Sequence, residues 1–229
     1  MFLLEELEEK IGYCFQDKSL LRQALTHSSF SNEQKINKWK NYERIEYLGD
    51  AVLELISSDY FYHTYPEETE GNLTKMRASA VCEQALAITA RELQLGGYMI
   101  FGKGEEQNGG RERESIIADA VEAIIGAIYL DGGLEQAKKF IHGFVLNDLD
   151  HKRLFYDAKS ILQERIQEAK LGELTYELIR EEGPEHEKNF VMEARLNGET
   201  IGTGQGKSKK TAQQHAAYDA LLKQNGTER

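Results

Sequence analysis

The sequence predicts an α+β protein of two domains: an all-α domain over residues 1–148 and an α-β-β-β-α domain over residues 157–225, joined by a linker over residues 149–156. Before the linker, apolar residues recur at helical spacing; beyond it, two stretches alternate in the manner of half-buried strands. The charge changes at the same point. The first 150 residues hold 15 lysines and arginines against 26 aspartates and glutamates, whereas the remainder is balanced at 13 and 13, so the whole net charge of −11 lies in the first part.

The composition excludes several classes of protein. No apolar run approaches the roughly 18 residues that a membrane span needs, and the acidic start MFLLEELEEK does not resemble a signal peptide. Cys14 and Cys82 stand far apart in no metal-binding spacing, so we expect both to be small buried residues of a reduced, cytoplasmic protein. An acidic chain is a poor general binder of nucleic acid, so such a role requires local basic clusters or bound metal ions.

The first domain is predicted to be a series of helices separated by short breaks. Thr69 and Ser115 are plausible caps for the helices that follow them. His27 is either a general base or ligand, or a buried histidine bonded to neighbouring backbone, and we favour the second. The predicted elements are one or two helices over 4–30 ending in THSSF, a polar loop over 31–40, helices over 41–63, 71–80, 82–94, 115–130 and 134–148, and a flexible Gly-rich loop over 102–114.

The helix over residues 41–63 carries the densest group of acids. Glu43, Glu46 and Asp50 lie three and four apart and share one face. Carboxylates stacked in this way repel one another, which suggests a divalent metal between them. Gly49 removes a side chain where a neighbour must come close, at a cost of roughly 1 kcal/mol against Ala. The apolar residues at helical spacing, expected to face a core, are Ile45, Leu48, Val52 and Leu55.

The helix over residues 115–130 is apolar nearly all round, which predicts burial. It nevertheless carries Asp119 and Glu122, three apart on one face. Two buried carboxylates are costly unless they are paired or bound to metal. The alternative is that both reach solvent at a rim. Gly126 and Ala127 would allow another helix to pack closely.

The second domain is predicted from a change of periodicity. An amphipathic helix over 158–170 precedes strands over 174–180, 189–196 and 199–204, and a helix with a face of small residues follows Gly206. Asn197-Gly198 is a strong two-residue hairpin signal between the second and third strands.

These motifs together resemble bacterial ribonuclease III. The blocks THSSF (26–30), NYERIEYLGDAV (41–52), EGNLTKMRA (70–78) and GGRERESIIADAVEAIIGAIYLDGG (109–133) match that family's nuclease domain in order, and residues 157–224 resemble a double-stranded RNA-binding domain. Several long motifs in register form a specific signal that covers nearly the whole chain.

The resemblance implies roles for the acids. Glu46, Asp50, Asp119 and Glu122 match the family's catalytic, metal-binding set, and Glu43 and Glu70 match two supporting acids. It implies Mg²⁺, with Mn²⁺ as a substitute and two ions in each active site. It also implies a homodimer through the helix over 41–63, in which Tyr47 falls where the family often has a Phe that inserts into the partner subunit.

The second domain would supply affinity for RNA. A-form RNA is recognised by its shape, 2′-hydroxyls and phosphates rather than by its bases. We expect the first helix to reach the minor groove, a loop to enter the next minor groove and the start of the last helix to hold phosphates. The residues concerned are Gln163, Glu164 and Gln167, then His186, and finally Lys207, Ser208, Lys209 and Lys210.

The leading hypothesis is therefore a metal-dependent endoribonuclease that cuts double-stranded RNA to 5′-phosphate and 3′-hydroxyl ends with short 3′ overhangs. By family likeness, its substrates would be ribosomal RNA precursors and other structured transcripts. One alternative is a non-catalytic RNA-binding dimer, which should lack one or more of the four metal acids; none is missing. Another is a metal phosphohydrolase for small molecules, against which the RNA-binding domain argues.

Overall fold

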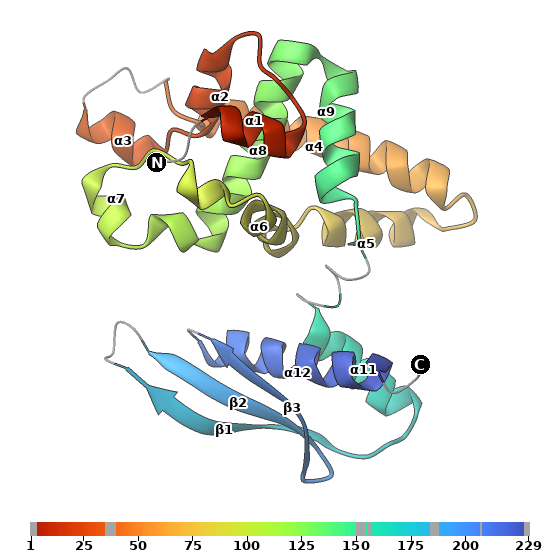
Figure 1. Cartoon of the computed structure of the whole chain (residues 1–229). Coiled ribbons are helices and arrows are strands. Elements are labelled where there is room, and N and C mark those ends of the chain that lie inside the picture. Colours follow the sequence, from red (N-terminus) through yellow and green to blue (C-terminus); the bar gives the residue numbers. More distant parts are fainter. Residues whose placement is uncertain are drawn as a thin grey trace. The chain divides into compact units, whose positions relative to one another are not determined.

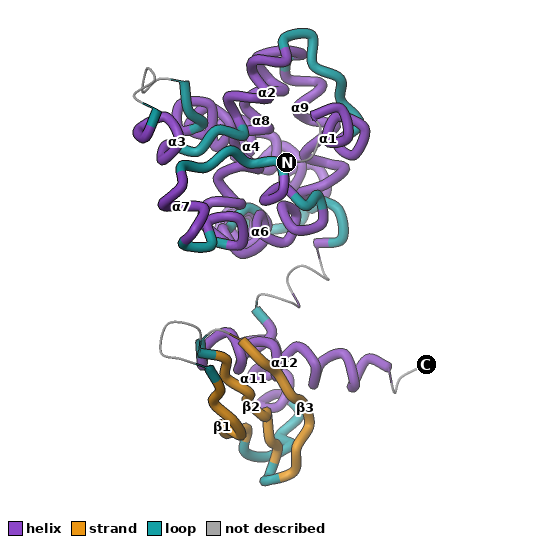
Figure 2. The backbone as a smooth tube through the Cα atoms, turned by 60° about the vertical axis from the view of Figure 1, so that its left-hand side comes forward, coloured by secondary structure: helices purple, strands orange, loops and turns teal. Residues whose placement is uncertain are grey.

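The computed structural model describes residues 4–34, 40–149, 154, 157–183, 188–206 and 208–226. It divides into two compact units, Met1–Leu149 and Asp150–Arg229 (Figures 1 and 2). The first is helical and the second combines a sheet with helices, so the predicted fold class is confirmed. Among the described residues, no helix has the length and apolar character needed to cross a membrane.

The first unit is a bundle built around α8 (Glu114–Gly132). This helix is buried along most of its length, with α2, α4, α6 and α9 packed around it (Figure 1). The other helical elements are α1 (Leu4–Ile11), α2 (Lys18–Ala24), α3 (Ser28–Glu33), α4 (Glu43–Thr64), α5 (Glu70–Ala80), α6 (Glu83–Glu92), η1 (Leu95–Gly97), α7 (Lys103–Gln107), η2 (Gly110–Glu112), α9 (Leu134–Phe140) and the π-helical turn η3 (Ile141–Val145).

Two glycines allow α4 and α8 to cross at very short range. A Cβ atom on Gly49 would lie 1.8 Å from the backbone oxygen of Glu122, and one on Gly126 would lie 2.2 Å from the backbone oxygen of Ile45. Neither position could hold a side chain without moving the helices apart. The predicted reason for Gly49, the close approach of a neighbour, is confirmed, as is the close packing expected at Gly126.

The buried face of α4 differs from the predicted one. Ile45 and Val52 are buried as expected, but Leu55 is 58% exposed and Leu48 only partly buried. The contact with α8 is centred on Gly49, which turns a different stripe toward the core. Leu55 instead lines a pocket between α4 and α5.

The Gly-rich stretch over 102–114 is more ordered than predicted. It contains α7 and η2, and side chains of neighbouring elements anchor it. The Glu33 carboxylate accepts hydrogen bonds from the backbone N–H groups of Lys103 and Gly104 at 2.8 and 3.1 Å. The Arg111 guanidinium pairs with Glu106 and donates to the Met99 carbonyl at 3.1 Å. The prediction of a flexible loop is therefore wrong, because helical turns, an internal ion pair and the distant residue Glu33 hold this stretch.

Several helix ends also differ from the prediction. Ser115 does not cap α8, which begins at Glu114 with no side-chain cap. THSSF does not end a helical stretch, because His27 caps a further helix, α3, which begins within this motif and continues into the predicted loop over 31–40. The prediction for Thr69 is confirmed: its hydroxyl accepts from the Asn72 N–H at 3.3 Å.

Neither cysteine is fully buried. Cys14 is exposed, on the connection after α1, and Cys82 is half-buried at the residue preceding α6. The expectation that both act as buried apolar residues is therefore wrong, since each lies between helices rather than on a helix face turned toward the core.

The second unit has the predicted α-β-β-β-α order, with a three-stranded antiparallel sheet in the order β1-β2-β3 (Figure 2). Asn197 and Gly198 form the predicted hairpin turn, with φ values of 51° and 86°. α12 packs closely on β3 because that strand offers glycines: a Cβ on Gly202 would lie 2.2 Å from the backbone oxygen of Ala216. The bounds are α11 (Ala158–Glu168), β1 (Leu174–Glu182), β2 (Asn189–Leu196), β3 (Glu199–Gly206) and α12 (Lys209–Gly226).

Candidate metal centre and RNA-binding surface

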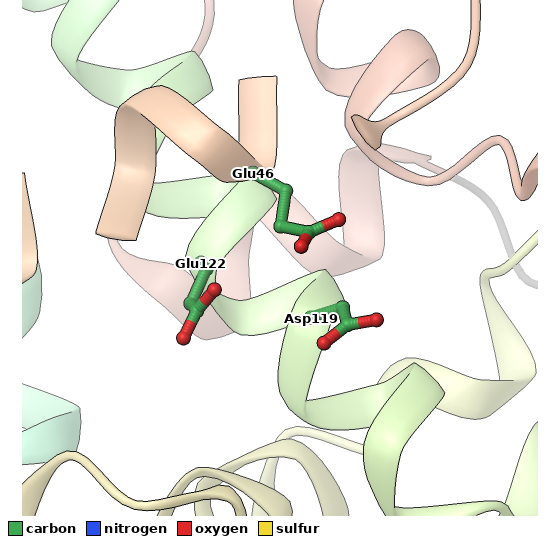
Figure 3. Close-up of side chains that lie close together, drawn as sticks. All are labelled: Glu46, Asp119 and Glu122. Atoms are coloured by element: carbon green, nitrogen blue, oxygen red, sulfur yellow. The ribbon is translucent and has the colours of Figure 1, made fainter. Parts of the chain in front are cut away.

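Three acids from two helices converge where α4 crosses α8. Glu46, on α4, and Asp119 and Glu122, on α8, each offer a carboxylate oxygen, and these oxygens lie within 4.8 Å of one another (Figure 3). All three side chains are half-buried. The spacing of three on α8 puts its two acids on one face, and the glycine crossing brings Glu46 to them. We call Glu46, Asp119 and Glu122 the carboxylate cluster.

Burial and mutual repulsion disfavour the ionised form of the acids in the carboxylate cluster. Burial, together with the charges of Asp50 and Asp119, raises the pKa of Glu122 to about 8. Burial and the neighbouring Asp119 and Glu43 charges raise the pKa of Glu46 to about 7. Such groups are easier to ionise once a cation lies among them.

Asp119 has a hydrogen-bond donor that the sequence did not indicate. The Tyr42 hydroxyl donates to Asp119 Oδ2 at 3.2 Å. Burial raises the pKa of Asp119, while this hydrogen bond opposes the rise. Tyr42 precedes α4 and is itself buried, so burial and the nearby acids raise the pKa of its phenol strongly. In the sequence, the position of Tyr42 directly before the acidic helix is the only feature that could have indicated this contact with Asp119.

The remaining predicted acids lie outside the carboxylate cluster. Asp50 is exposed, although its charge acts on both Glu46 and Glu122. Glu43 is exposed at the start of α4, where its carboxylate accepts from the Asn41 side-chain amide at 3.3 Å. Glu70 begins α5, accepts from the Thr74 hydroxyl at 3.0 Å and lines the pocket between α4 and α5.

His27 has the structural role that we favoured. Its Nδ1 accepts from the backbone N–H of Ser29 at 3.2 Å, which caps α3. Its ring packs against those of Tyr42 and Phe101, with centroid distances of 5.5 and 5.3 Å. Burial lowers the pKa of His27, so its ring favours the neutral form.

The carboxylate cluster fits a divalent cation of the Mg²⁺ type. Mg²⁺ prefers oxygen ligands and is usually held by a few carboxylates while keeping some water. Three convergent carboxylates meet that description. A metal held by oxygen ligands can activate water and neutralise developing negative charge at a phosphate.

Those predicted RNA-contacting residues that the structure describes are exposed, on α11 or at the start of α12. Gln163, Glu164 and Gln167 are exposed on α11, whose opposite face buries Leu162 and Ile166. At the start of α12, Lys209 and Lys210 are exposed, and the Ser208 hydroxyl accepts from the Thr211 N–H at 3.1 Å. Ser208 therefore has a capping contact besides any contact with RNA. His186 and Lys207 lie outside the described residues.

The fold and the site together define a class of protein: a helical domain with a half-buried carboxylate cluster, followed by a domain of the double-stranded RNA-binding type. Family models agree. Residues 17–149 match the family described as ribonuclease-III-like, and residues 158–224 match the double-stranded RNA binding motif.

Curated relatives match over almost the entire chain. The ribonuclease 3 of Caldanaerobacter subterraneus is 48% identical over 224 residues, which cover 96% of this chain and 98% of the relative. That of Enterococcus faecalis is 49% identical over 221 residues, covering 96% of each. A solved nuclease domain of ribonuclease III from Campylobacter jejuni aligns with a TM-score of 0.59 and 45% identity, over 62% of this chain and 96% of that one. The chain belongs to the ribonuclease III family and is an endoribonuclease.

Proposed function

We propose that this endoribonuclease cleaves double-stranded RNA at the carboxylate cluster and requires Mg²⁺, which Mn²⁺ can replace, with two ions in each active site. The observation that carries this proposal is the convergence of Glu46, Asp119 and Glu122 within 4.8 Å in a chain that also has a double-stranded RNA binding motif. Asp50 is proposed as the fourth metal acid, since its charge acts on two members of the cluster. Glu43 and Glu70 are proposed as supporting acids.

The chain's own residues would bind and orient the metal, while the bound metal supplies the activated water and stabilises the leaving 3′ oxygen. Glu46 and Glu122 must lose their protons on binding, because their raised pKa values keep them partly protonated near neutral pH. The products would carry 5′-phosphate and 3′-hydroxyl ends with short 3′ overhangs. Ribosomal RNA precursors and other structured transcripts are the proposed substrates.

The second domain would hold the duplex. Lys209 and Lys210, exposed at the start of α12, would contact phosphates, while Gln163, Glu164 and Gln167, exposed on α11, would reach minor-groove hydroxyls. Ser208, Lys207 and His186 complete the proposed surface. We keep 1–148, 149–156 and 157–225 as the proposed domain boundaries.

We also propose a homodimer formed through α4. This helix leaves large apolar side chains in solvent: Tyr47 is 80% exposed and Tyr62 67% exposed. Tyr62 also lines an open pocket of about 670 Å³ between α4 and α5, together with Leu55, Phe61 and Leu73. We propose that Tyr47 of a second copy inserts into part of this pocket. The Campylobacter jejuni nuclease domain is described as having a region involved in dimer formation, which supports the proposal.

A direct experiment tests this function. The purified chain is incubated with a long RNA duplex and with a single strand of the same sequence, each with Mg²⁺ and with a chelator. We expect cleavage of the duplex only, and only with Mg²⁺. Binding without cleavage under every metal condition would favour the non-catalytic alternative, and cleavage in the presence of the chelator would contradict the metal mechanism.

A further inference from the structure

We propose that Tyr42 is a positioning residue of the metal centre, which holds Asp119 and Glu46 in register with each other across the crossing of α4 and α8. The inference rests on the proposed function of the carboxylate cluster. It adds a residue that contacts the metal acids without itself being a candidate ligand.

Tyr42 forms hydrogen bonds with residues of both helices of the site. Its hydroxyl donates to Asp119 Oδ2 at 3.2 Å. Its backbone oxygen accepts from the N–H groups of Ile45 and Glu46 at 2.8 and 2.9 Å, which forms the first turn of α4. One side chain and one carbonyl group thus connect the acid contributed by α4 with an acid contributed by α8.

Tyr42 itself is held firmly. Only 4% of its surface is exposed, and its N–H donates to the Thr26 carbonyl at 2.9 Å. Its ring packs against His27, whose own ring is fixed by the bond to Ser29. The hydroxyl is therefore presented from a fixed point and constrains the rotation of the Asp119 carboxylate.

This arrangement has a chemical consequence. The Tyr42 hydroxyl donates to Oδ2 of Asp119 and not to Oδ1, so the hydrogen bond distinguishes the two oxygens of this carboxylate. Hydrogen bonds that orient a metal-binding carboxylate typically change metal affinity by 10–100-fold when they are removed. A buried Tyr also needs an acceptor for its own sake, so the test must separate metal positioning from ordinary satisfaction of a buried hydroxyl.

The chain offers a matched control for that separation. The Tyr13 hydroxyl donates to Asp131 Oδ2 at 2.7 Å, in the same domain and outside the carboxylate cluster. Tyr42→Phe and Tyr13→Phe each delete one hydroxyl that is bonded to an aspartate. Both should lower thermal stability to a similar extent, but only Tyr42→Phe should affect the metal.

The experiment uses the full chain and two readouts. Mn²⁺ binding without RNA is followed from the signal of free Mn²⁺ in electron paramagnetic resonance, and the Mg²⁺ concentration for half-maximal cleavage of duplex is measured separately. We expect Tyr42→Phe to weaken Mn²⁺ binding and raise the half-maximal Mg²⁺ concentration by about tenfold. The cleavage rate should recover at saturating Mg²⁺, with KM for RNA unchanged, and Tyr13→Phe should match the parent protein.

Each outcome separates this inference from the function on which it rests. If the parent protein cleaves with Mg²⁺ and Tyr42→Phe shows the same metal dependence as Tyr13→Phe, then the hydroxyl only satisfies a buried group and the inference is wrong. A tighter metal site in Tyr42→Phe would overturn it as well. If the parent protein shows no metal-dependent cleavage, the proposed function itself fails.

Discussion

Glu122 and Glu46 are carboxyl groups whose surroundings favour protonation. Burial and neighbouring acids raise the pKa of Glu122 to about 8 and that of Glu46 to about 7. In the folded, metal-free protein, these two carboxyl groups therefore stay largely protonated up to about pH 7. In the unfolded chain they would already be ionised well below neutral pH. Binding of a cation would reverse the preference, which couples metal, protons and stability at one site.

The first prediction concerns the pH dependence of stability without metal. The folded state binds more protons than the unfolded state between about pH 4.5 and 8, so the free energy of unfolding should fall as pH rises through this range. The carboxylates are partly exposed and solvent screens them, so we expect a loss of only about 1–2 kcal/mol between pH 6 and 8. Thermal unfolding at several pH values, with a chelator and with Mg²⁺, measures this loss. Mg²⁺ should reduce the dependence of stability on pH.

Two variants provide the comparison. Glu122→Gln removes the most strongly affected group and should flatten the metal-free slope. Glu70→Gln, an exposed acid outside the carboxylate cluster, should leave it unchanged. A metal-free stability that rises from pH 6 to 8 would contradict the account of the cluster.

At this scale the sequence predicts part of the carboxylate cluster but not how its members are held. The approach of Glu46 to the acids of α8 follows only from the family resemblance, and Asp50, expected with them, lies outside the cluster. The spacing of three between Asp119 and Glu122 predicts a shared helix face. Nothing in the pattern indicates that Tyr42 bonds to Asp119, because that contact joins residues 77 positions apart. It depends on the entry path of α4, which tertiary packing decides.

At the scale of elements, the crossing of α4 and α8 determines the site. Gly49 and Gly126 let the helix backbones approach so closely that a Cβ at either position would overlap the other helix. Glu46 and Glu122 lie beside this crossing, three residues before Gly49 and four before Gly126. Separating the helices would therefore disperse the carboxylates.

Gly49→Ala tests the crossing. Its Cβ would lie 1.8 Å from the Glu122 backbone oxygen, so the helices must shift, and overpacking of this kind typically costs about 1–3 kcal/mol or more. We expect a lower melting temperature and weaker metal binding. Gly71→Ala is the control, since its Cβ would meet nothing within 4 Å and Ala is favoured in a helix. Equal stability of the two variants would contradict the proposed role of Gly49.

A second prediction at this scale concerns the two lysines at the start of α12. Replacing Lys209 and Lys210 with Ala should weaken binding to duplex RNA and reduce its salt dependence, since roughly one counterion is released for each phosphate contact. Lys223→Ala is the control: it removes a cation from the other end of α12, where Lys223 pairs with Asp219 at 2.6 Å. An unchanged salt slope in the double variant would count against the proposed phosphate contacts.

Helices and strands are predicted well from the sequence where only one of their faces packs against the rest of the domain. The strand over 189–196 and the Asn197-Gly198 turn follow from alternation and turn chemistry alone. Leu55 was placed wrongly because α4 has apolar residues on more than one face, and periodicity does not say which face meets the core. The stretch over 102–114 was misjudged because distant residues such as Glu33 anchor it.

For the whole molecule, the division of charge matters most. The first 150 residues carry the whole net charge of −11, while the remainder is neutral overall. Without metal, the first unit should repel RNA, and the basic surface of the second unit must supply the affinity. The charge division is evident in the sequence because charge totals do not depend on the fold. The homodimer remains a prediction that follows only from the family likeness.

A fragment of residues 1–149 tests the proposed assembly. We expect it to fold, to form a dimer through the exposed apolar residues of α4, and to cleave duplex RNA only weakly because it lacks the second unit. Light scattering coupled to size exclusion measures its mass. Tyr47→Asp should shift the fragment toward monomer by placing a charge in the interface. A folded fragment that is monomeric at every concentration would contradict the α4 interface.

The most direct test of the central claim compares binding and cleavage in Glu122→Gln. Duplex RNA is given to the parent protein and to this variant. Binding is measured by gel shift with a chelator, where no cleavage is expected, and cleavage is measured by product length in Mg²⁺. The account predicts that the variant binds duplex about as well as the parent protein but cleaves it no faster than background, because the substitution removes a metal carboxylate and leaves the RNA-binding unit intact. Cleavage by Glu122→Gln at the parental rate would contradict the claim that the carboxylate cluster is the catalytic centre.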